Sequence, residues 1–234
     1  MTSENRSRHP HVHPKGPDRV VRALAKRYRG KADMDLGNPK DTLLGVLLSA
    51  RTTDVQVLKI FPAFKKRFPT WASLARSSPA AIGKAISSIG LYRSKAKAIH
   101  GLANMILKNH AGRVPKTLEE LTVLPGVGRK TANCVLSHVY HQDTVCVDTH
   151  VFRIAHRLGW SRGKTPEKVE EDIKRILPKS LWSETNRVFV QFGRDICKAR
   201  KPECWHCPVR LWCPYEPKTE KPKGKGEEGV GSGE

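Results

Sequence analysis

Four of the chain's six cysteines are crowded into one short stretch near its C-terminal end, in the pattern C-x6-C-x2-C-x5-C: Cys197, Cys204, Cys207 and Cys213. Because the N-terminus lacks the apolar run of a secretory signal, such a cluster suggests a metal centre before disulfides. The spacing itself leaves two occupants open, a zinc ion and an iron–sulfur cluster. Either one would pin the loop after the first cysteine. Three cations in that loop could then face phosphates: Lys198, Arg200 and Lys201.

The other two cysteines, Cys134 and Cys146, lie in apolar surroundings. We interpret them as small buried core residues and not as ligands. His206, inside the cluster, could ligate in principle, but four thiolates already suffice for one centre.

Nearly every apolar pattern in the chain has helical spacing. In SKAKAIHGLANMILK, four apolar residues recur at i, i+3, i+4 and i+7. The run KDTLLGVLLSA is apolar almost all round, which predicts a buried helix. The β-branched run TVCVDTH is too isolated to build a sheet. We therefore predict an all-α fold with helices over 18–30, 40–50, 94–108, 165–177 and 182–196, the first capped by Asp18 and the fourth by Thr165.

The net charge of +21 lies in the body of the chain. Residues 1–17 contribute +2 and residues 214–234 contribute −1, and both ends have the composition of disordered arms. A basic body favours a polyanionic partner, with nucleic acid the leading candidate, although a merely soluble basic protein is the alternative. No apolar run reaches the ~18 residues of a membrane span. We expect a cytoplasmic protein, associated with the nucleoid in a prokaryote.

The stretch LPGVGRKT, residues 124–131, joins two helical patterns through a proline and two glycines. Gly126 and Gly128 can adopt positive φ and leave backbone N–H groups bare at the start of the second helix, which favours a phosphate site. A P-loop is excluded because no glycine stands directly before the lysine. On this pattern alone, a plain helix–helix turn stays open.

Lys130 adds a chemical possibility to the turn. The helix dipole and the neighbouring Arg129 both oppose its protonation, and a neutral lysine is a good amine nucleophile for a Schiff base. Such an amine needs a partner carboxylate. Asp148 opens a later helical pattern and is the candidate, although an ordinary helix N-cap also explains it. The sequence does not place the two side chains near each other.

Four pieces of the sequence stand in a fixed order: LLSARTTD (47–54), IGLYRSKA (89–96), LPGVGRKTAN (124–133) with VDTH (147–150), and the four-cysteine run. Together they resemble the endonuclease III family of DNA glycosylases, within the helix-hairpin-helix superfamily, over about residues 18–213. The resemblance implies two helical domains that flank a DNA cleft. One is a six-helix barrel at 40–145. The other combines 18–39 with 146–213 and holds a 4Fe-4S cluster, which favours iron–sulfur over zinc.

The resemblance also implies base-excision repair of double-stranded DNA, in which oxidised pyrimidines are removed and the strand is then nicked. Lys130 would attack the sugar of a flipped nucleotide, and Asp148 would activate the lysine and balance the charge on the sugar. β-Elimination from the Schiff base would cut the strand at the abasic site. We expect the protein to act as a monomer.

The same resemblance assigns DNA contacts. The hairpin backbone at Gly126, Val127 and Gly128 would hold a phosphate, and Leu91 would be the apolar wedge that keeps the kinked duplex open. Further contacts are expected from Arg129 and His150.

One residue departs from the family's pattern. The family segment usually reads LLSAQTTD, but this chain has Arg51 in place of the glutamine that fills the gap left by the flipped base. Arginine only donates hydrogen bonds, so it should favour an acceptor-rich orphan base such as guanine. We expect a shifted opposite-base preference or a narrower lesion range.

Three other functions are weighed against this interpretation. Adenine-excising relatives lack the lysine and carry a further C-terminal domain. A lysine-bearing thymine or uracil mismatch enzyme is harder to exclude. A non-catalytic DNA-binding protein would be expected to lose Lys130 or Asp148, and this chain has both.

Overall fold

In the computed structural model, residues 16–30 and 34–222 are described, and they form helices and loops without any strand. The predicted all-α fold is confirmed. No helix in this part of the chain is long and apolar enough to cross a membrane. The expected disorder of residues 1–15 and 223–234 lies outside the described residues. The helices are α1 (Pro17–Arg27), α2 (Pro39–Ser49), α3 (Asp54–Arg67), α4 (Trp71–Arg76), α5 (Pro79–Ala85), α6 (Tyr92–His110), α7 (Leu118–Thr122), α8 (Arg129–Tyr140), α9 (Thr149–Arg157), α10 (Pro166–Ile176) and α11 (Trp182–Asp195), with 3-10 turns at Lys179–Leu181, Cys204–His206 and Arg210–Trp212.

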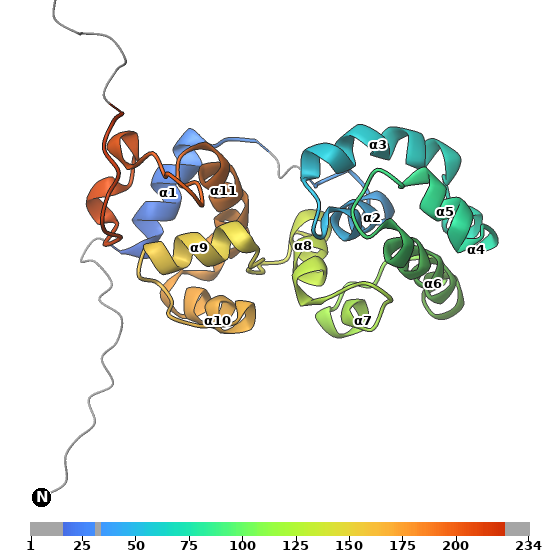
Figure 1. The fold of residues 1–234 in the computed structure, drawn as a ribbon. Helices are drawn as coiled ribbons and strands as arrows, with labels where there is room; N and C mark the ends of the chain where they lie inside the picture. The colour runs from blue at the N-terminus through green and yellow to red at the C-terminus, as the bar shows by residue number, and fades with distance from the viewer. Residues whose placement is uncertain (1–15, 31–33, 223–234) are drawn as a thin grey trace, which may run out of the picture.

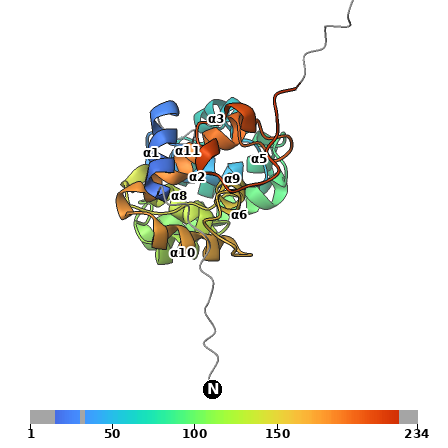
Figure 2. The same cartoon turned by 90° about the vertical axis from the view of Figure 1, so that its left-hand side faces the viewer.

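The helices pack around two separate hydrophobic cores (Figure 1). Helices α2 to α8 surround the first core, and α1 with α9 to α11 surrounds the second. Figure 2 looks along the line that joins the two lobes, with the second lobe toward the viewer. Core membership departs from the expected domain limits at three positions. Met34 and Cys146 belong to the first core, and Val145 belongs to the second.

The first helix of the chain packs on the last one. Helix α1 contacts α11, although most of the chain lies between them. Tyr28, directly after α1, donates its hydroxyl to Asp195 Oδ2 at 2.6 Å, and its carbonyl accepts from Arg187 Nη1 at 2.6 Å. The chain therefore starts in the second lobe with α1, forms the first lobe with α2 to α8, and returns to the second lobe with α9 to α11.

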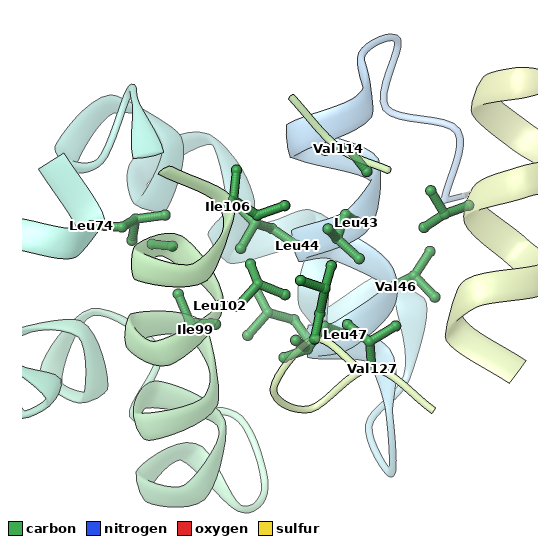
Figure 3. Close-up of a cluster of buried hydrophobic side chains, with 14 of the residues drawn as sticks. Leu43, Leu44, Val46, Leu47, Leu74, Ile99, Leu102, Ile106, Val114 and Val127 are labelled. Atoms are coloured by element: carbon green, nitrogen blue, oxygen red, sulfur yellow. The ribbon is translucent and has the colours of Figure 1, made fainter. Parts of the chain in front are cut away.

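Helix α2 is the centre of the first lobe. Every residue from Asp41 to Ser49 is buried, as predicted for this apolar run. Figure 3 shows the leucines of α2 beside the apolar stripe of α6, which includes Ile99 and Leu102. Each fully buried Leu or Ile side chain stabilises the fold by about 1.5–3 kcal/mol. Val127, in the turn before α8, also lies in this core, so the turn is anchored to the first lobe.

Two of the three cap assignments are confirmed. The Thr165 side chain accepts from the backbone N–H of Lys168 at 3.3 Å and caps α10, and Asp148 caps α9. The assignment of Asp18 is wrong, because the N-cap residue of α1 is Gly16, two residues earlier. Asp18 lies in the first helical turn, where its charge still favours the positive end of the helix dipole.

Candidate active site

The turn between α7 and α8 is a tight hairpin packed on the first core. Gly126 has a φ of 77°, in the left-handed region that favours glycine. A Cβ at this position would lie 2.8 Å from Ala98 Cβ and 3.3 Å from Leu47 Cδ1, so the space also requires glycine. Gly128 has a φ of −87° and is the N-cap residue of α8. Of the two glycines that could adopt positive φ, only Gly126 does so.

The start of α8 is open to an anion. No side chain caps this helix, and a Cβ added to Gly128 would meet nothing within 4 Å. Within the described chain, no hydrogen bond uses the backbone N–H groups of residues 128–131. The first N–H groups of a helix lack intrahelical acceptors and carry the positive end of its dipole. A phosphate can bind there through the backbone alone. The Val127 side chain is buried, so that residue also offers only its backbone.

Lys130 and Asp148 come together at one cleft between the lobes. Lys130 lies in the first turn of α8, and Asp148 directly precedes α9. Both line a cleft of about 890 Å³, which Arg51, Asp54 and His150 also line. The same two residues line an adjoining cavity of about 40 Å³. An amine and a carboxylate thus face one space.

Asp148 is held by the helix that it caps. Its Oδ1 accepts from the backbone N–H groups of His150 at 2.9 Å and Val151 at 2.8 Å. Its Oδ2 makes no hydrogen bond within the described chain, so one oxygen fixes the carboxylate and the other stays available. Capping and a chemical role are therefore compatible in this residue.

His150 presents a neutral ring to the cleft. Its Nδ1 lies 3.1 Å from Arg153 Nη2. Because arginine only donates, Nδ1 accepts and the ring proton sits on Nε2. Burial lowers the pKa of His150, and Arg153 and Arg194 lower it further against the opposing effect of Asp148. The Nε2–H group is then a donor that needs no protonation, which suits the predicted DNA contact.

Several polar residues of the smaller cavity were not predicted from the sequence: His138, Asn186, Arg187 and Gln191. His138 lies at i+8 from Lys130, on the same face of α8. Its Nδ1 is buried without a hydrogen-bond partner within the described chain, and burial lowers its pKa. Helical spacing from Lys130 was the available signal for His138. The residues of α11 gave no comparable signal, because only the fold brings that helix to the cleft.

The two residues expected to enter the DNA stack lie in adjacent turns. Arg51 and Leu91 have φ values of 55° and 60°, a region that non-glycine residues rarely adopt. Both are exposed, Leu91 by 55%. A Cβ at Gly90 would lie 3.6 Å from Arg51 O, so the two turns touch.

The predicted DNA-binding cations differ in their surroundings. Arg129 donates from Nε and Nη2 to the two carboxylate oxygens of Glu170, at 2.9 and 3.1 Å. Lys198 is paired with Glu203. Arg200 and Lys201 are exposed and make no ion pair within residues 16–30 and 34–222. In this structure Arg129 bridges α8 to α10, so a phosphate would compete with Glu170 for its guanidinium.

The four clustered cysteines meet at one apolar cavity beside the second core. Cys197, Cys204, Cys207 and Cys213 all line it as free thiols. Arg157 Nη1 donates to Cys197 Sγ at 3.2 Å. Within the described chain, no three His, Cys, Asp or Glu side chains are arranged to hold a single metal ion.

The chain after Cys213 packs back on the cysteine loop. The Thr219 hydroxyl accepts from the Cys204 N–H at 3.1 Å. The Tyr215 ring centre lies 4.6 Å from the guanidinium carbon of Arg157. The part of the expected C-terminal arm that the structure describes is thus in contact with the second lobe.

The interpretation of Cys134 and Cys146 as buried core residues is confirmed. The structure adds a disulfide between them, which joins residues 12 apart in sequence. Cys134 lies one turn after Lys130, and Cys146 lies two residues before Asp148. Cys146 Sγ is 3.3 Å from Lys130 O. The disulfide therefore joins the two segments that carry the candidate catalytic residues.

Comparison with known proteins identifies the family of the chain. Residues 44–179 match the model of the HhH-GPD superfamily of base excision DNA repair proteins. The chain is 38% identical over 211 residues to endonuclease III of Thermotoga maritima, covering 90% of this chain and 96% of the relative. An endonuclease III trapped as a covalent intermediate with DNA superposes with a TM-score of 0.80 at 37% identity, covering 83% of this chain and 92% of that one. A thermostable thymine-DNA glycosylase superposes with a TM-score of 0.73 at 25% identity, covering 84% and 94%. The chain thus belongs to the endonuclease III family, whose members are DNA glycosylase/AP lyases of base excision repair.

Proposed function

We propose that this protein, acting as a cytoplasmic monomer, removes oxidised pyrimidines from double-stranded DNA and then cleaves the strand at the abasic site. The observation that carries this proposal is the convergence of Lys130 and Asp148 on one cleft. The cleft is large enough for a nucleotide extruded from the duplex, which base excision requires. The trapped covalent complex of the related endonuclease III supports the same class of chemistry.

The proposed reaction uses the two residues in sequence. Asp148 accepts a proton from Lys130, and the free amine attacks C1′ as the bond from C1′ to the base breaks. The base leaves with the bonding electrons and takes up the proton from Asp148, and the carboxylate that this restores balances the positive charge that develops on the sugar. Opening of the sugar ring at C1′ gives the Schiff base. This iminium acidifies the C2′ proton, and its loss expels the 3′ phosphate by β-elimination. Water then releases Lys130.

The bare N–H groups at the start of α8 would hold a phosphate of the damaged strand, beside the lysine of the same helix turn. Leu91 would wedge the duplex open, and Arg51 would occupy the space left by the flipped nucleotide. Arg200, Lys201 and His150 would contact the backbone. These contacts are mostly to phosphates, so DNA affinity should fall steeply as salt rises.

We propose that Arg51 gives the enzyme a preference for lesions opposite guanine, whose O6 and N7 accept from a guanidinium. The likeness to a thymine-DNA glycosylase makes excision of mismatched thymine opposite guanine the second candidate function. Excision rates opposite guanine and adenine should differ in the wild type, and the difference should shrink in Arg51→Gln. Equal ratios in the two proteins would refute the assignment.

We propose a 4Fe-4S cluster at the four clustered cysteines. The residues present fit such a group, since four free thiols line one cavity whose walls include Phe192 and Val209. Four cysteine thiolates are the usual ligands of this cluster, and the Arg157 donor to Cys197 Sγ is the kind of outer contact that tunes it. When bound, the cluster would tie the loop carrying Arg200 and Lys201 to the second lobe. Purified protein should contain iron and sulfide and absorb visible light, whereas a colourless zinc protein would overturn this assignment.

Borohydride trapping tests the catalytic proposal. It reduces the Schiff base, so wild-type protein should cross-link to duplex DNA containing thymine glycol or an abasic site. Lys130→Ala should lose the adduct. Asp148→Asn should slow excision sharply while binding DNA about as well as wild type. A persistent adduct in Lys130→Ala would exclude Lys130 as the nucleophile, and unchanged excision in Asp148→Asn would leave Asp148 only its role as a helix cap.

A further inference from the structure

Lys95, on α6, is a buried lysine that the proposed reaction does not use. Its residue is only 7% exposed. Its Nζ donates to Leu48 O at 2.7 Å and to Thr52 Oγ1 at 3.3 Å. Lys95 makes no ion pair within the described chain, and burial alone lowers its pKa. Burying a cation without a carboxylate is unfavourable, so the position calls for a reason beyond packing.

The two acceptors of Lys95 belong to the Arg51 turn. Leu48 is in the last turn of α2, where carbonyl oxygens lack intrahelical partners and the helix dipole favours a cation. Thr52 directly follows Arg51. The ammonium group thus binds the chain on both sides of Arg51 and satisfies a carbonyl that the end of α2 leaves open.

Lys95 itself belongs to the Leu91 turn. Leu91 is the N-cap residue of α6, and its carbonyl accepts from the Lys95 N–H at 3.0 Å. Where the turns touch, a Cβ at Gly90 would also lie 3.7 Å from Thr52 Oγ1. The buried Lys95 side chain therefore connects the exposed Arg51 and Leu91 turns on their protein-facing side.

We propose that Lys95 is a positioning residue that holds the Arg51 and Leu91 turns as one rigid unit, so that both enter the DNA stack together. This rests on the roles proposed above for Arg51 and Leu91. A rigid pair makes opening of the duplex a single concerted step, because neither turn can yield separately to the closing bases. Chemistry at Lys130 does not depend on this unit once the nucleotide is already outside the stack.

The test compares a paired lesion with a site that needs no opening. Lys95→Met keeps the length of the side chain and removes the ammonium. We expect it to slow single-turnover excision of thymine glycol from a fully paired duplex by about tenfold or more, as loss of a charge-assisted hydrogen bond in the opening step implies. Borohydride trapping at an abasic site inside an unpaired bubble should stay within about twofold of wild type. Lys97→Met is the matched control, since Lys97 lies on the same helix and is exposed; it should leave both rates unchanged.

Two further measurements separate positioning from mere folding. Leu91→Ala should also slow excision from the paired duplex and spare trapping at the bubble. In the double variant with Lys95→Met, the fold-reduction of the excision rate on the paired duplex should be much smaller than the product of the two single fold-reductions. If Lys95→Met proves too unstable to assay, Thr52→Val removes one acceptor at nearly constant volume and should show a weaker form of the same pattern. Equal slowing on both substrates, or no slowing on either, would overturn the proposal. Failure of wild-type protein to trap the bubble substrate would instead refute the proposed lysine chemistry.

Discussion

Glu170 is the buried acid that joins the two lobes beside the active site. Its side chain is 5% exposed. It accepts from Arg129 at 2.9 and 3.1 Å, from Lys174 Nζ at 2.5 Å and from Asn133 Nδ2 at 3.3 Å. Arg129 and Asn133 lie on α8 with Lys130, whereas Glu170 lies on α10, which packs on the helix capped by Asp148. Glu170→Gln therefore tests what holds the two proposed catalytic residues at one cleft.

The expected cost follows from these contacts. Removing one partner of a buried ion pair costs about 3–5 kcal/mol. The Arg129 side chain is 45% exposed, so solvent screens part of its interaction, and the glutamine oxygen can still accept from Asn133. We therefore expect a loss of about 2–3 kcal/mol. For a chain of this size, each kcal/mol corresponds to about 2–4 °C in Tm, so melting should fall by about 4–12 °C.

The effect should depend on pH in a defined direction. Burial by itself raises the pKa of Glu170, but its hydrogen bonds from Arg129 and Lys174 outweigh burial and hold the pKa below the usual 4.5. A carboxylate with a depressed pKa stabilises the folded state above the unfolded pKa, and this contribution is lost as pH falls through the folded value. The difference in stability between wild type and Glu170→Gln should thus be full at pH 7 and shrink below about pH 4.5.

Calorimetry at several pH values measures the loss of stability in Glu170→Gln. Borohydride trapping at neutral pH measures its loss of activity. Glu167→Gln is the matched control, because Glu167 lies on the same helix, is exposed and makes no ion pair within the described chain. Trapping by Glu170→Gln should fall well below that of the control at a temperature where both are folded. The reasoning fails if the two variants melt within about 1 °C of each other, or if their difference persists unchanged at pH 3.

Two other changes give equally direct outcomes. Replacing Cys134 and Cys146 together by alanine should lower the free energy of unfolding by about 2–4 kcal/mol in urea, because a loop of 12 residues is no longer closed in the unfolded chain. Reductant should lower the stability of wild type to that of the variant. A wild type whose stability is unaffected by reductant would mean that the two cysteines are not bonded. Gly126→Ala should destabilise the fold by about 2–4 kcal/mol, because alanine is strained at a φ of 77° and its Cβ would lie 2.8 Å from Ala98 Cβ. Gly128→Ala, at a φ of −87° with open space around it, should melt close to wild type; a larger loss there than at Gly126 would contradict the geometry.

Local chemistry explains what the sequence could predict. The apolar run of α2, the cap at Thr165 and the glycine at 126 each depend on residues within a few positions, and each is found as expected. The prediction that Asp18 caps the first helix failed because α1 already starts at Gly16 and Pro17, and a glycine N-cap residue has no capping side chain to recognise in the sequence. The disulfide was missed for a different reason. Apolar neighbours predict burial for Cys134 and Cys146 but say nothing about which buried groups meet.

What the sequence could not predict is where segments from different lobes come together. Lys130 and Asp148 share a cleft because α8 ends the first lobe, the chain turns directly into the second, and Glu170 of α10 then binds α8 through Arg129 and Asn133. Each of those contacts joins residues about 40 positions apart. Arg129 illustrates the consequence. Beside a candidate nucleophile it looks like a phosphate ligand, and only the fold supplies the carboxylate that occupies it. A basic residue next to a candidate nucleophile can therefore also fix the helix that carries it.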